Sequence, residues 1–366
     1  MLIVIPQIAH IYQDWNDLSI VLEVSSVLLM MLLGMLKTLA CTVNSNNIET
    51  LIHFLLTDFW QSAASNPFYR CLEKYAIHAR NITKGYLFLI FNALLIFYCL
   101  PLLDIFILEY KGMLGNNSKH FPFLALYPGS FYETPLYEII YISQIMASIA
   151  CALVILATDT LIATALVHTC GHYFTLQENL KNLNTSFNLV YQLQYQQKIS
   201  QNIIQNIKYQ LKQSIKYHHV ILWFCEIMEK NFSLILLLQT ISSTMIICLV
   251  GMQVSTSGLT DSTKLMKYFS YLIMALSQLL LFCFPGDELI YQSSMVSKTV
   301  YSIEWYQSSV PIRTEICMML LRSQKPSCIT AGKFYVMHLE NFNAILSTSL
   351  SYFMVLQNLN TENNDV

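Results

Sequence analysis

The chain has 366 residues, of which 55% are apolar and only 11% are Asp, Glu, Lys or Arg. Soluble globular domains carry about 25% charged residues, so a large share of this surface cannot face water. The net charge of −2 and the absence of a dense Lys/Arg block exclude a strongly basic nucleic-acid-binding protein. Intrinsic disorder is excluded by the apolar content. The composition therefore predicts an all-α fold, a polytopic transmembrane helical bundle.

Six stretches of the sequence are long and apolar enough to cross a bilayer, which takes about 20 residues of helix. Residues 1–11 are also apolar, but Pro6 interrupts them and they are too short to cross, so we interpret them as the remnant of a first transmembrane helix. The chain then has a seven-helix architecture with six complete spans here. In chain order these predicted spans are Leu18–Leu36, Tyr86–Leu108, Leu136–Val167, Phe232–Met252, Tyr268–Pro285 and Phe334–Leu356.

The positive charges are distributed unevenly between the loops. All Lys and Arg residues except Lys111, Lys119, Lys264 and Lys267 lie in the loops that follow the first, third and fifth complete spans. Loops rich in Lys and Arg stay in the cytoplasm. This pattern predicts a C-terminus outside and, with the remnant helix counted, an N-terminus inside. The orientation is the reverse of that of a G-protein-coupled receptor.

One N-glycosylation site follows from this orientation. Asn116 heads an Asn-Asn-Ser triplet in the loop between the second and third complete spans, which is predicted to lie outside. Asn81, Asn184 and Asn231 head similar triplets on the cytoplasmic side, where they are expected to stay bare.

The cytoplasmic stretch Gln192–His219 has helical periodicity. Its apolar residues recur every fourth position, and lysines follow an adjoining face. The stretch is predicted to be a helix that rests on the membrane surface or packs against other subunits, and we favour the second interpretation. The apolar stripe consists of Ile199, Ile203, Ile207, Leu211 and Ile215.

Carboxylates inside the spans are few. Glu23, Asp104 and Asp159 fall within apolar stretches, and Lys37 is assigned to the loop after the first complete span, so no basic side chain is expected to pair with them there. Charges inside a bilayer usually have a function, but no chain of carboxylates crosses the membrane and no inverted repeat is visible, as a carrier would require.

Enzymatic and metal chemistry are not expected. No nucleophile with a partnered base lies at membrane depth. The segment His168-Thr-Cys170-Gly-His172 has the residue types of a metal site, but no second Cys/His pair supplies the remaining ligands. We predict neither a metal nor a cofactor.

The C-terminal third carries a recognisable set of segments. They are Phe282–Ser293 (FCFPGDELIYQS), Tyr301–Tyr306 (YSIEWY), Arg322–Pro326 (RSQKP), Ile329–Tyr335 (ITAGKFY) and Ser349–Leu356 (SLSYFMVL). Their order and spacing resemble the C-terminal region of insect odorant receptors. The position of Gln357 also resembles the ending of the related gustatory receptors, which keeps that sister family open. The charge pattern opposes a G-protein-coupled receptor, and the few intramembrane charges oppose a membrane carrier.

The resemblance implies a subunit of an odorant-gated, non-selective cation channel, a heterotetramer with a co-receptor in the plasma membrane of sensory-neuron dendrites. By position, it places Val355 and Leu359 at a hydrophobic pore gate. It divides the chain into a first-helix remnant, a transmembrane bundle with cytoplasmic extensions, an intersubunit segment, a pore-lining helix and an extracellular tail. These are residues 1–11, 12–285, 286–333, 334–358 and 359–366.

The resemblance also implies an odorant pocket in the outer half of the bundle, taking a small apolar or volatile molecule. Tyr268 and Tyr271 are three residues apart in the fifth complete span and are expected to share a helix face, with a tyrosyl hydroxyl orienting the ligand. The other predicted lining residues are Phe97, Ile142, Ile145, Met146 and Ile149.

Overall fold

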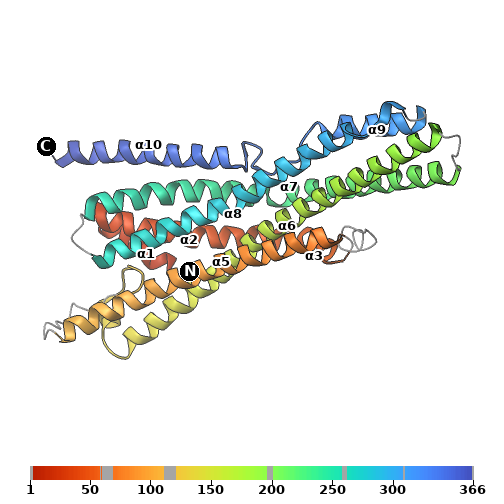
Figure 1. Ribbon diagram of the computed structural model, residues 1–366. Coiled ribbons are helices and arrows are strands. Elements are labelled where there is room, and N and C mark those ends of the chain that lie inside the picture. The colour runs from red at the N-terminus through yellow and green to blue at the C-terminus, as the bar shows by residue number, and fades with distance from the viewer. Residues whose placement is uncertain are drawn as a thin grey trace.

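The computed structural model describes residues 3–57, 59, 69–110, 121–195, 201–257, 262–307 and 310–364. These residues form long helices and one small hairpin (Figure 1). The elements are α1 (Val4–Gln13), α2 (Leu18–Val43), α3 (Ser45–Leu56), α5 (Tyr69–Tyr110), η1 (Gly129–Tyr132), α6 (Leu136–Tyr195), α7 (Gln201–Ser257), α8 (Ser262–Tyr301), η2 (Trp305–Gln307), α9 (Val310–Ser323), β1 (Thr330–Ala331), β2 (Tyr335–Val336) and α10 (Leu339–Asn364).

Five helices of the described part are long and apolar enough to cross a membrane, and they confirm five of the six predicted spans. The sixth prediction is wrong in its start, because Tyr335 and Val336 form strand β2 and α10 begins only at Leu339. The more polar α10 is not among the five. At the front, α1 has 10 residues, which rise about 15 Å and cannot cross a hydrocarbon layer of about 30 Å.

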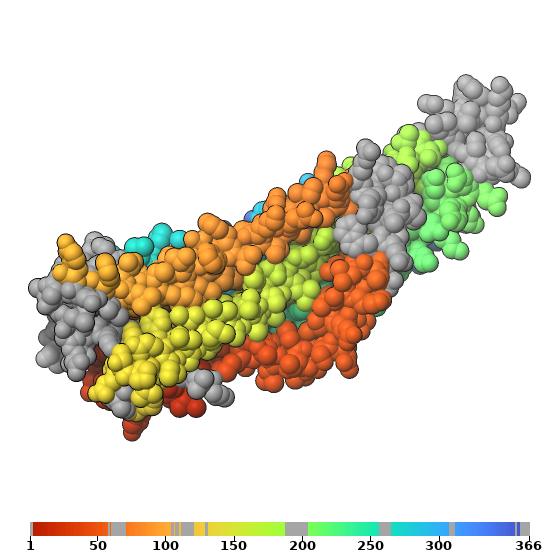
Figure 2. All heavy atoms as spheres, turned by 90° about the horizontal axis from the view of Figure 1, so that it is seen from below, coloured from red at the N-terminus to blue at the C-terminus, as the bar shows by residue number. Residues whose placement is uncertain are grey.

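Two helices extend far beyond a bilayer. The 60 residues of α6 and the 57 residues of α7 rise about 90 and 85 Å at 1.5 Å per residue, against about 30 Å for the hydrocarbon core. The C-terminal part of α6 and the N-terminal part of α7, with α3 and α9, form what we call the extension half, on the right of Figure 1. The opposite end of the bundle, which holds the start of α6 and the end of α7, is called the cavity half. Figure 2 shows α5 (orange) and α6 (yellow-green) lying side by side along the molecule.

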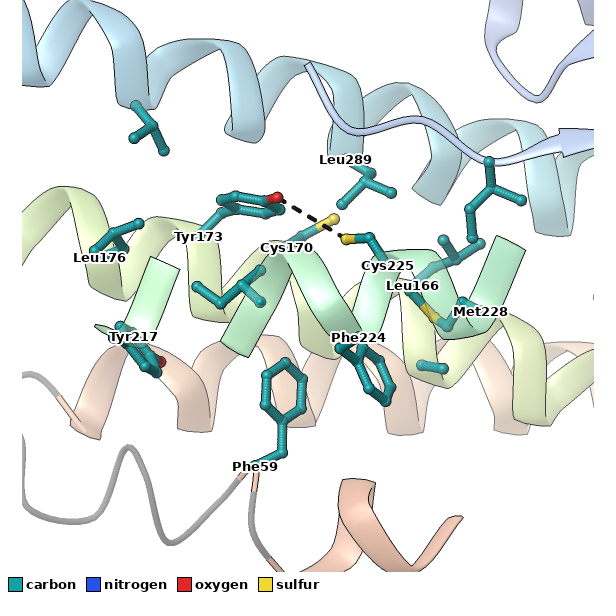
Figure 3. Close-up of a cluster of buried hydrophobic side chains, with 14 of the residues drawn as sticks. Phe59, Leu166, Cys170, Tyr173, Leu176, Tyr217, Phe224, Cys225, Met228 and Leu289 are labelled. Atoms are coloured by element: carbon teal, nitrogen blue, oxygen red, sulfur yellow. Dashed lines mark hydrogen bonds between the residues drawn. The ribbon is translucent and has the colours of Figure 1, made fainter. Parts of the chain in front are cut away.

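The largest apolar core of the molecule lies in the extension half (Figure 3). The Phe59 ring stacks on the His172 imidazole with centroids 3.5 Å apart. Tyr173 is fully buried, and its hydroxyl is hydrogen-bonded to the Ser327 hydroxyl at 2.6 Å. This contact ties α6 to the segment that precedes the hairpin.

The described part of the apolar stripe in the Gln192–His219 stretch, which is Ile207, Leu211 and Ile215, belongs to this same core. Ile207 is 3% exposed and Leu211 is fully buried, both within the chain's own core. The prediction that this stripe packs against other subunits is therefore wrong for these two residues. The physical reason is that α6 and α7 lie against each other and cover each other's apolar faces.

The hairpin β1–β2 holds the start of α10 against α7 and α8. The Glu229 carboxylate on α7 accepts hydrogen bonds from the Thr330 backbone N–H, at 2.8 Å, and from its hydroxyl. The Gly332 N–H donates to the Ser233 carbonyl at 2.9 Å, and its φ of +61° is one that glycine adopts without strain. On α8, a Cβ at Gly286 would lie 2.1 Å from the Met337 carbonyl oxygen, so only glycine permits this close approach.

An ion pair lies buried at the centre of the bundle. The Lys37 ammonium on α2 is 2.5 Å from the Asp159 carboxylate on α6, and both side chains are 0% exposed. The prediction that no basic side chain pairs with the intramembrane carboxylates is wrong for Asp159, because α2 continues past Lys37 to Val43. The Tyr86 hydroxyl donates to Asp159 at 2.9 Å, and the Gln278 amide donates to both Asp159 and Tyr86.

The polar cluster extends to a fifth helix. The Gln239 side chain on α7 donates to the Gln278 carbonyl oxygen at 3.1 Å and to the Ser243 hydroxyl at 2.9 Å. We call Lys37, Tyr86, Asp159, Gln239, Ser243 and Gln278 the central network; it joins α2, α5, α6, α7 and α8.

We expect Lys37→Met to destabilise the fold by about 3–5 kcal/mol, because it leaves the Asp159 carboxylate buried without a counter-charge. The double variant Lys37→Met/Asp159→Leu should recover much of this loss, since it removes both charges. Thermal unfolding in detergent, followed by fluorescence-detected size exclusion, measures both effects, with the exposed Lys84→Met as the matched control. A double variant no more stable than Lys37→Met would contradict this account.

Candidate ligand cavity

A cavity lies inside the cavity half of the bundle, between α2, α5, α6, α8 and the segment before η1. Its empty volume is about 640 Å³, counting the part that opens outward. The walls are almost entirely apolar: α2 contributes Val27, Met30 and Met31, and α6 contributes Cys151, Ala152 and Ile155.

One wall of the cavity is aromatic. The rings of Phe97 on α5 and Phe123 are stacked, with centroids 5.8 Å apart. Tyr271 on α8 meets Phe97 edge to face at 4.9 Å. Such geometries are the favoured ones for aromatic pairs. They fix the three rings relative to one another, so a ligand meets a preformed surface.

The segment that carries Phe123 folds inward as a lid, held by one glutamine. Gln144 on α6 is fully buried. Its carbonyl oxygen accepts from the Phe123 N–H at 3.2 Å, and its amide donates to the Phe123 carbonyl at 3.3 Å and to the Tyr127 hydroxyl at 3.3 Å. Farther along, the Leu126 N–H donates to the Pro6 carbonyl of α1. The segment 121–127 therefore closes the cavity on the side of the α5–α6 connection.

The polar groups that line the cavity are few. Ser148, Ser270 and Tyr271 are the lining residues that carry a hydroxyl. Ser148 is already engaged, since its hydroxyl is hydrogen-bonded to the Tyr98 hydroxyl at 2.5 Å and donates to carbonyls of its own helix. The described residues contain no cluster of three or more His, Cys, Asp or Glu side chains that could hold a metal. The chemistry available is the binding of a small, mostly apolar molecule.

The structure distributes the seven predicted pocket residues over several environments. Phe97 and Tyr271 line the cavity. Tyr268 is buried one turn away and packs with α7 and α10 residues such as Ile246 and Ile345. The remaining four, on α6, do not line the cavity: Ile142 and Met146 are 60% and 61% exposed, Ile145 packs against the lid's aromatic cluster, and Ile149 is half-buried.

The α6 face that does line the cavity was missed because, apart from Ile155, it is made of small side chains. Ser148, Cys151 and Ala152 lie there, and a Cβ at Gly34 of α2 would come within 2.3 Å of the Cys151 sulfur. Small residues inside an apolar span mark close approaches between helices. The small residues Ser148, Cys151 and Ala152 were therefore the available sequence signal for the cavity-facing side of α6.

The predicted pore residue Val355 lies outside the cavity. Helix α10 runs along the outside of the bundle against α7 and α8 (Figure 1). Val355 is 56% exposed on it, whereas Ile345 faces inward and is 7% exposed. The side chain of Leu359 and the whole of Asn116 lie outside the described residues.

Comparisons with known proteins agree with this architecture. Residues 17–350 match the family described as the 7tm odorant receptor. Odorant receptor 13a of Drosophila melanogaster is 29% identical over 368 residues, covering 96% of this chain and 83% of the relative. The odorant receptor coreceptor of Aedes aegypti is 31% identical over 150 residues, covering 40% of this chain and 31% of the relative.

A solved structure shares the fold. The insect olfactory receptor OR5 from Machilis hrabei, in complex with eugenol, superposes with a TM-score of 0.77 at 17% identity, covering 97% of this chain and 86% of that one. The helical bundle, the C-terminal segments and the sequence similarity together favour an odorant receptor over a gustatory receptor, a G-protein-coupled receptor or a carrier. The chain belongs to the seven-transmembrane odorant receptor family.

Proposed function

We propose that this chain is the odorant-binding subunit of a ligand-gated, non-selective cation channel that assembles with a co-receptor subunit as a heterotetramer in the plasma membrane. The observation that carries the proposal is the apolar cavity with its aromatic wall. Its lining is almost entirely apolar, and pockets that bind small molecules are lined predominantly by apolar and aromatic side chains with a few polar groups. The relative from Machilis hrabei, solved with eugenol, supports a small volatile ligand.

The ligand chemistry follows from the lining. Burial of hydrocarbon against apolar walls is favourable, and we assign the orientation of a polar end to the hydroxyl of Tyr271, a lining residue. The proposed ligand is therefore a small, mostly apolar volatile with a single hydroxyl, ether or carbonyl oxygen.

The exposed face of α10 supports its role as the pore-lining helix. Ser347, Ser351 and Val355 follow one another at four-residue spacing and are all exposed, so the chain's own bundle leaves this face uncovered. Leu359 continues the same spacing in the sequence. Val355 and Leu359 would form a hydrophobic constriction, which closes a pore by excluding water. The orientation with the N-terminus inside and the C-terminus outside, derived from the loop charges, belongs to this proposal.

The central network supports a connection between cavity and pore. Three cavity residues lie one helical turn from network members on the same helix: Ile90 from Tyr86, Ile155 from Asp159, and Met274 from Gln278. The network reaches α7 through Gln239, and α7 is one of the two helices against which α10 packs. A displacement of these three cavity residues would thus be passed through the network to α7, which supports the proposed pore helix α10.

Loss of the Tyr271 ring should weaken the odorant response. The agonist is chosen by screening volatile alcohols, esters and phenols, including eugenol, on the receptor expressed with a co-receptor. Tyr271→Phe should raise the half-maximal concentration about fivefold, the effect of losing about 1 kcal/mol of hydrogen bonding. Tyr271→Ala should cost about 1–3 kcal/mol, because it also removes buried ring surface.

Tyr268→Phe is the comparison that separates the two tyrosines. It should leave the dose–response curve unchanged, because Tyr268 packs between helices and does not line the cavity. A shift in Tyr268→Phe without one in Tyr271→Phe would place the orienting hydroxyl at Tyr268 instead.

Polar substitution of the proposed constriction should affect the pore and not the ligand. Val355→Ser lowers the dewetting barrier, so we expect a larger odorant-free current or altered ion permeability with the ranking of odorants unchanged. Voltage-clamp recording of the receptor with its co-receptor measures both. Leu350→Ser, an equally exposed residue on another side of α10, is the control. A Val355→Ser receptor that changes only the odorant ranking would show that α10 binds ligand.

A further inference from the structure

A second recess lies directly behind the ligand cavity. It is a groove between α5 and α8 with an empty volume of about 530 Å³, counting its open side. Ile96 from α5 and Phe269 and Ile273 from α8 line the groove and not the cavity.

The wall between groove and cavity is one side chain thick. Ala93, Ser270 and Met274 line both spaces. Ala93 and Ser270 are small. Met274 is 5% exposed and is the large group of the wall, and its unbranched thioether side chain changes rotamer more easily than a branched or aromatic one. A rotation of Met274 is therefore the smallest change that could join the two spaces.

The open side of the groove lies within two candidate membrane spans, so we expect it to face lipid. Its lining residues fall within the candidate spans Cys71–Leu103 and Leu265–Tyr301. Phe269 is 64% exposed and Ile273 is 39% exposed at its rim. Exposed apolar side chains on the outside of a transmembrane bundle contact acyl chains.

The opposite route into the cavity is closed more firmly. On the side of the lid, entry requires the displacement of Phe123, whose N–H and carbonyl are both hydrogen-bonded to the buried Gln144 side chain. Breaking buried hydrogen bonds costs more than a rotamer change of an apolar side chain. An apolar volatile also concentrates in the bilayer, so the groove offers both the lower barrier and the richer source.

We propose that the α5–α8 groove is a lateral portal through which apolar ligands pass from the bilayer into the cavity, with Met274 as the movable part of the wall. This inference rests on the proposed function of the cavity. A portal lies outside the binding site, so obstructing it changes the rates of entry and exit by the same factor and leaves the equilibrium affinity unchanged.

The test narrows or widens the groove without touching the cavity. Ile96→Trp fills the groove, and we expect onset and washout of the current, at odorant concentrations below half-maximal, to slow together on the order of tenfold, the effect of about 1.4 kcal/mol on the barrier. Phe269→Ala opens the rim and should speed both. The agonist from the volatile panel is the probe, and rapid perfusion gives the rates. Leu95→Trp adds the same bulk at a neighbouring exposed position of α5 that lines neither space and should change neither rate.

The outcomes separate the portal from the cavity. If both groove variants show the same onset and washout rates as Leu95→Trp, the portal is overturned. The portal is also overturned if Gln144→Leu shows faster onset while the groove variants keep unchanged kinetics, because the ligand would then enter past the lid. A changed half-maximal concentration in Phe269→Ala would also overturn it, since the groove would then be part of the binding site. Surface biotinylation confirms delivery, and if Ile96→Trp fails to reach the membrane, Phe269→Ala, altered at an exposed residue, decides alone. Failure of the proposed function would show separately, as no odorant response in the unmodified receptor.

Discussion

The buried pair of Lys37 and Asp159 constrains how the rest of the bundle can be arranged. Two full charges without contact to solvent are tolerable only if they stay together and their remaining hydrogen-bonding capacity is filled. Tyr86 and Gln278 fill part of that capacity, and Gln239 adds α7. Five helices therefore meet at one point and can move only in ways that keep the network closed. The candidate cavity lies one helical turn away from this point, so a molecule bound there as proposed would act next to the part of the fold that this network constrains.

The membrane-spanning character of the chain could be predicted from composition and apolar runs, because it depends on the summed hydropathy of neighbouring residues. The pairing of Lys37 with Asp159 could not be predicted in this way. Lys37 follows directly after an apolar run, which makes it look like the first residue of a loop, and its partner lies 122 positions away. The continuation of α2 to Val43 turns the same residue into an intramembrane one. Likewise, the stripe through Ile207 and Leu211 indicated a helix with a buried face, although α6 ends at Tyr195 and α7 begins at Gln201 within the predicted stretch. Periodicity does not say whether the covering surface belongs to the same chain.

The candidate cavity was predictable in its elements and less so in its residues. Phe97 and Tyr271 line it, whereas Ile142 and Met146 point away from the bundle. Helix α6 is apolar on most sides, as membrane helices are, so hydropathy carries little information about which side faces inward. The inward side is instead marked by small residues such as Ser148 and Ala152, which allow helices to approach. Large apolar residues in such a span are as well suited to lipid as to a ligand.

The hairpin before α10 has a mechanical consequence. Glu229 holds Thr330, and the Met337 carbonyl sits against Gly286, so the first turn of α10 is fixed to both α7 and α8. Near the other end of α10, the Gln357 side-chain amide donates to the Ser255 hydroxyl of α7 at 3.1 Å, so α10 follows α7 when the two helices tilt about the hairpin. The hairpin is then the pivot, and the displacement of α10 grows with distance from it. Val355 lies 16 residues after Leu339, about 24 Å along the helix at 1.5 Å per residue. A tilt of only about 5° at the pivot moves Val355 sideways by about 2 Å over that length. A displacement of this size is comparable with the contact distance between a dehydrated cation and oxygen.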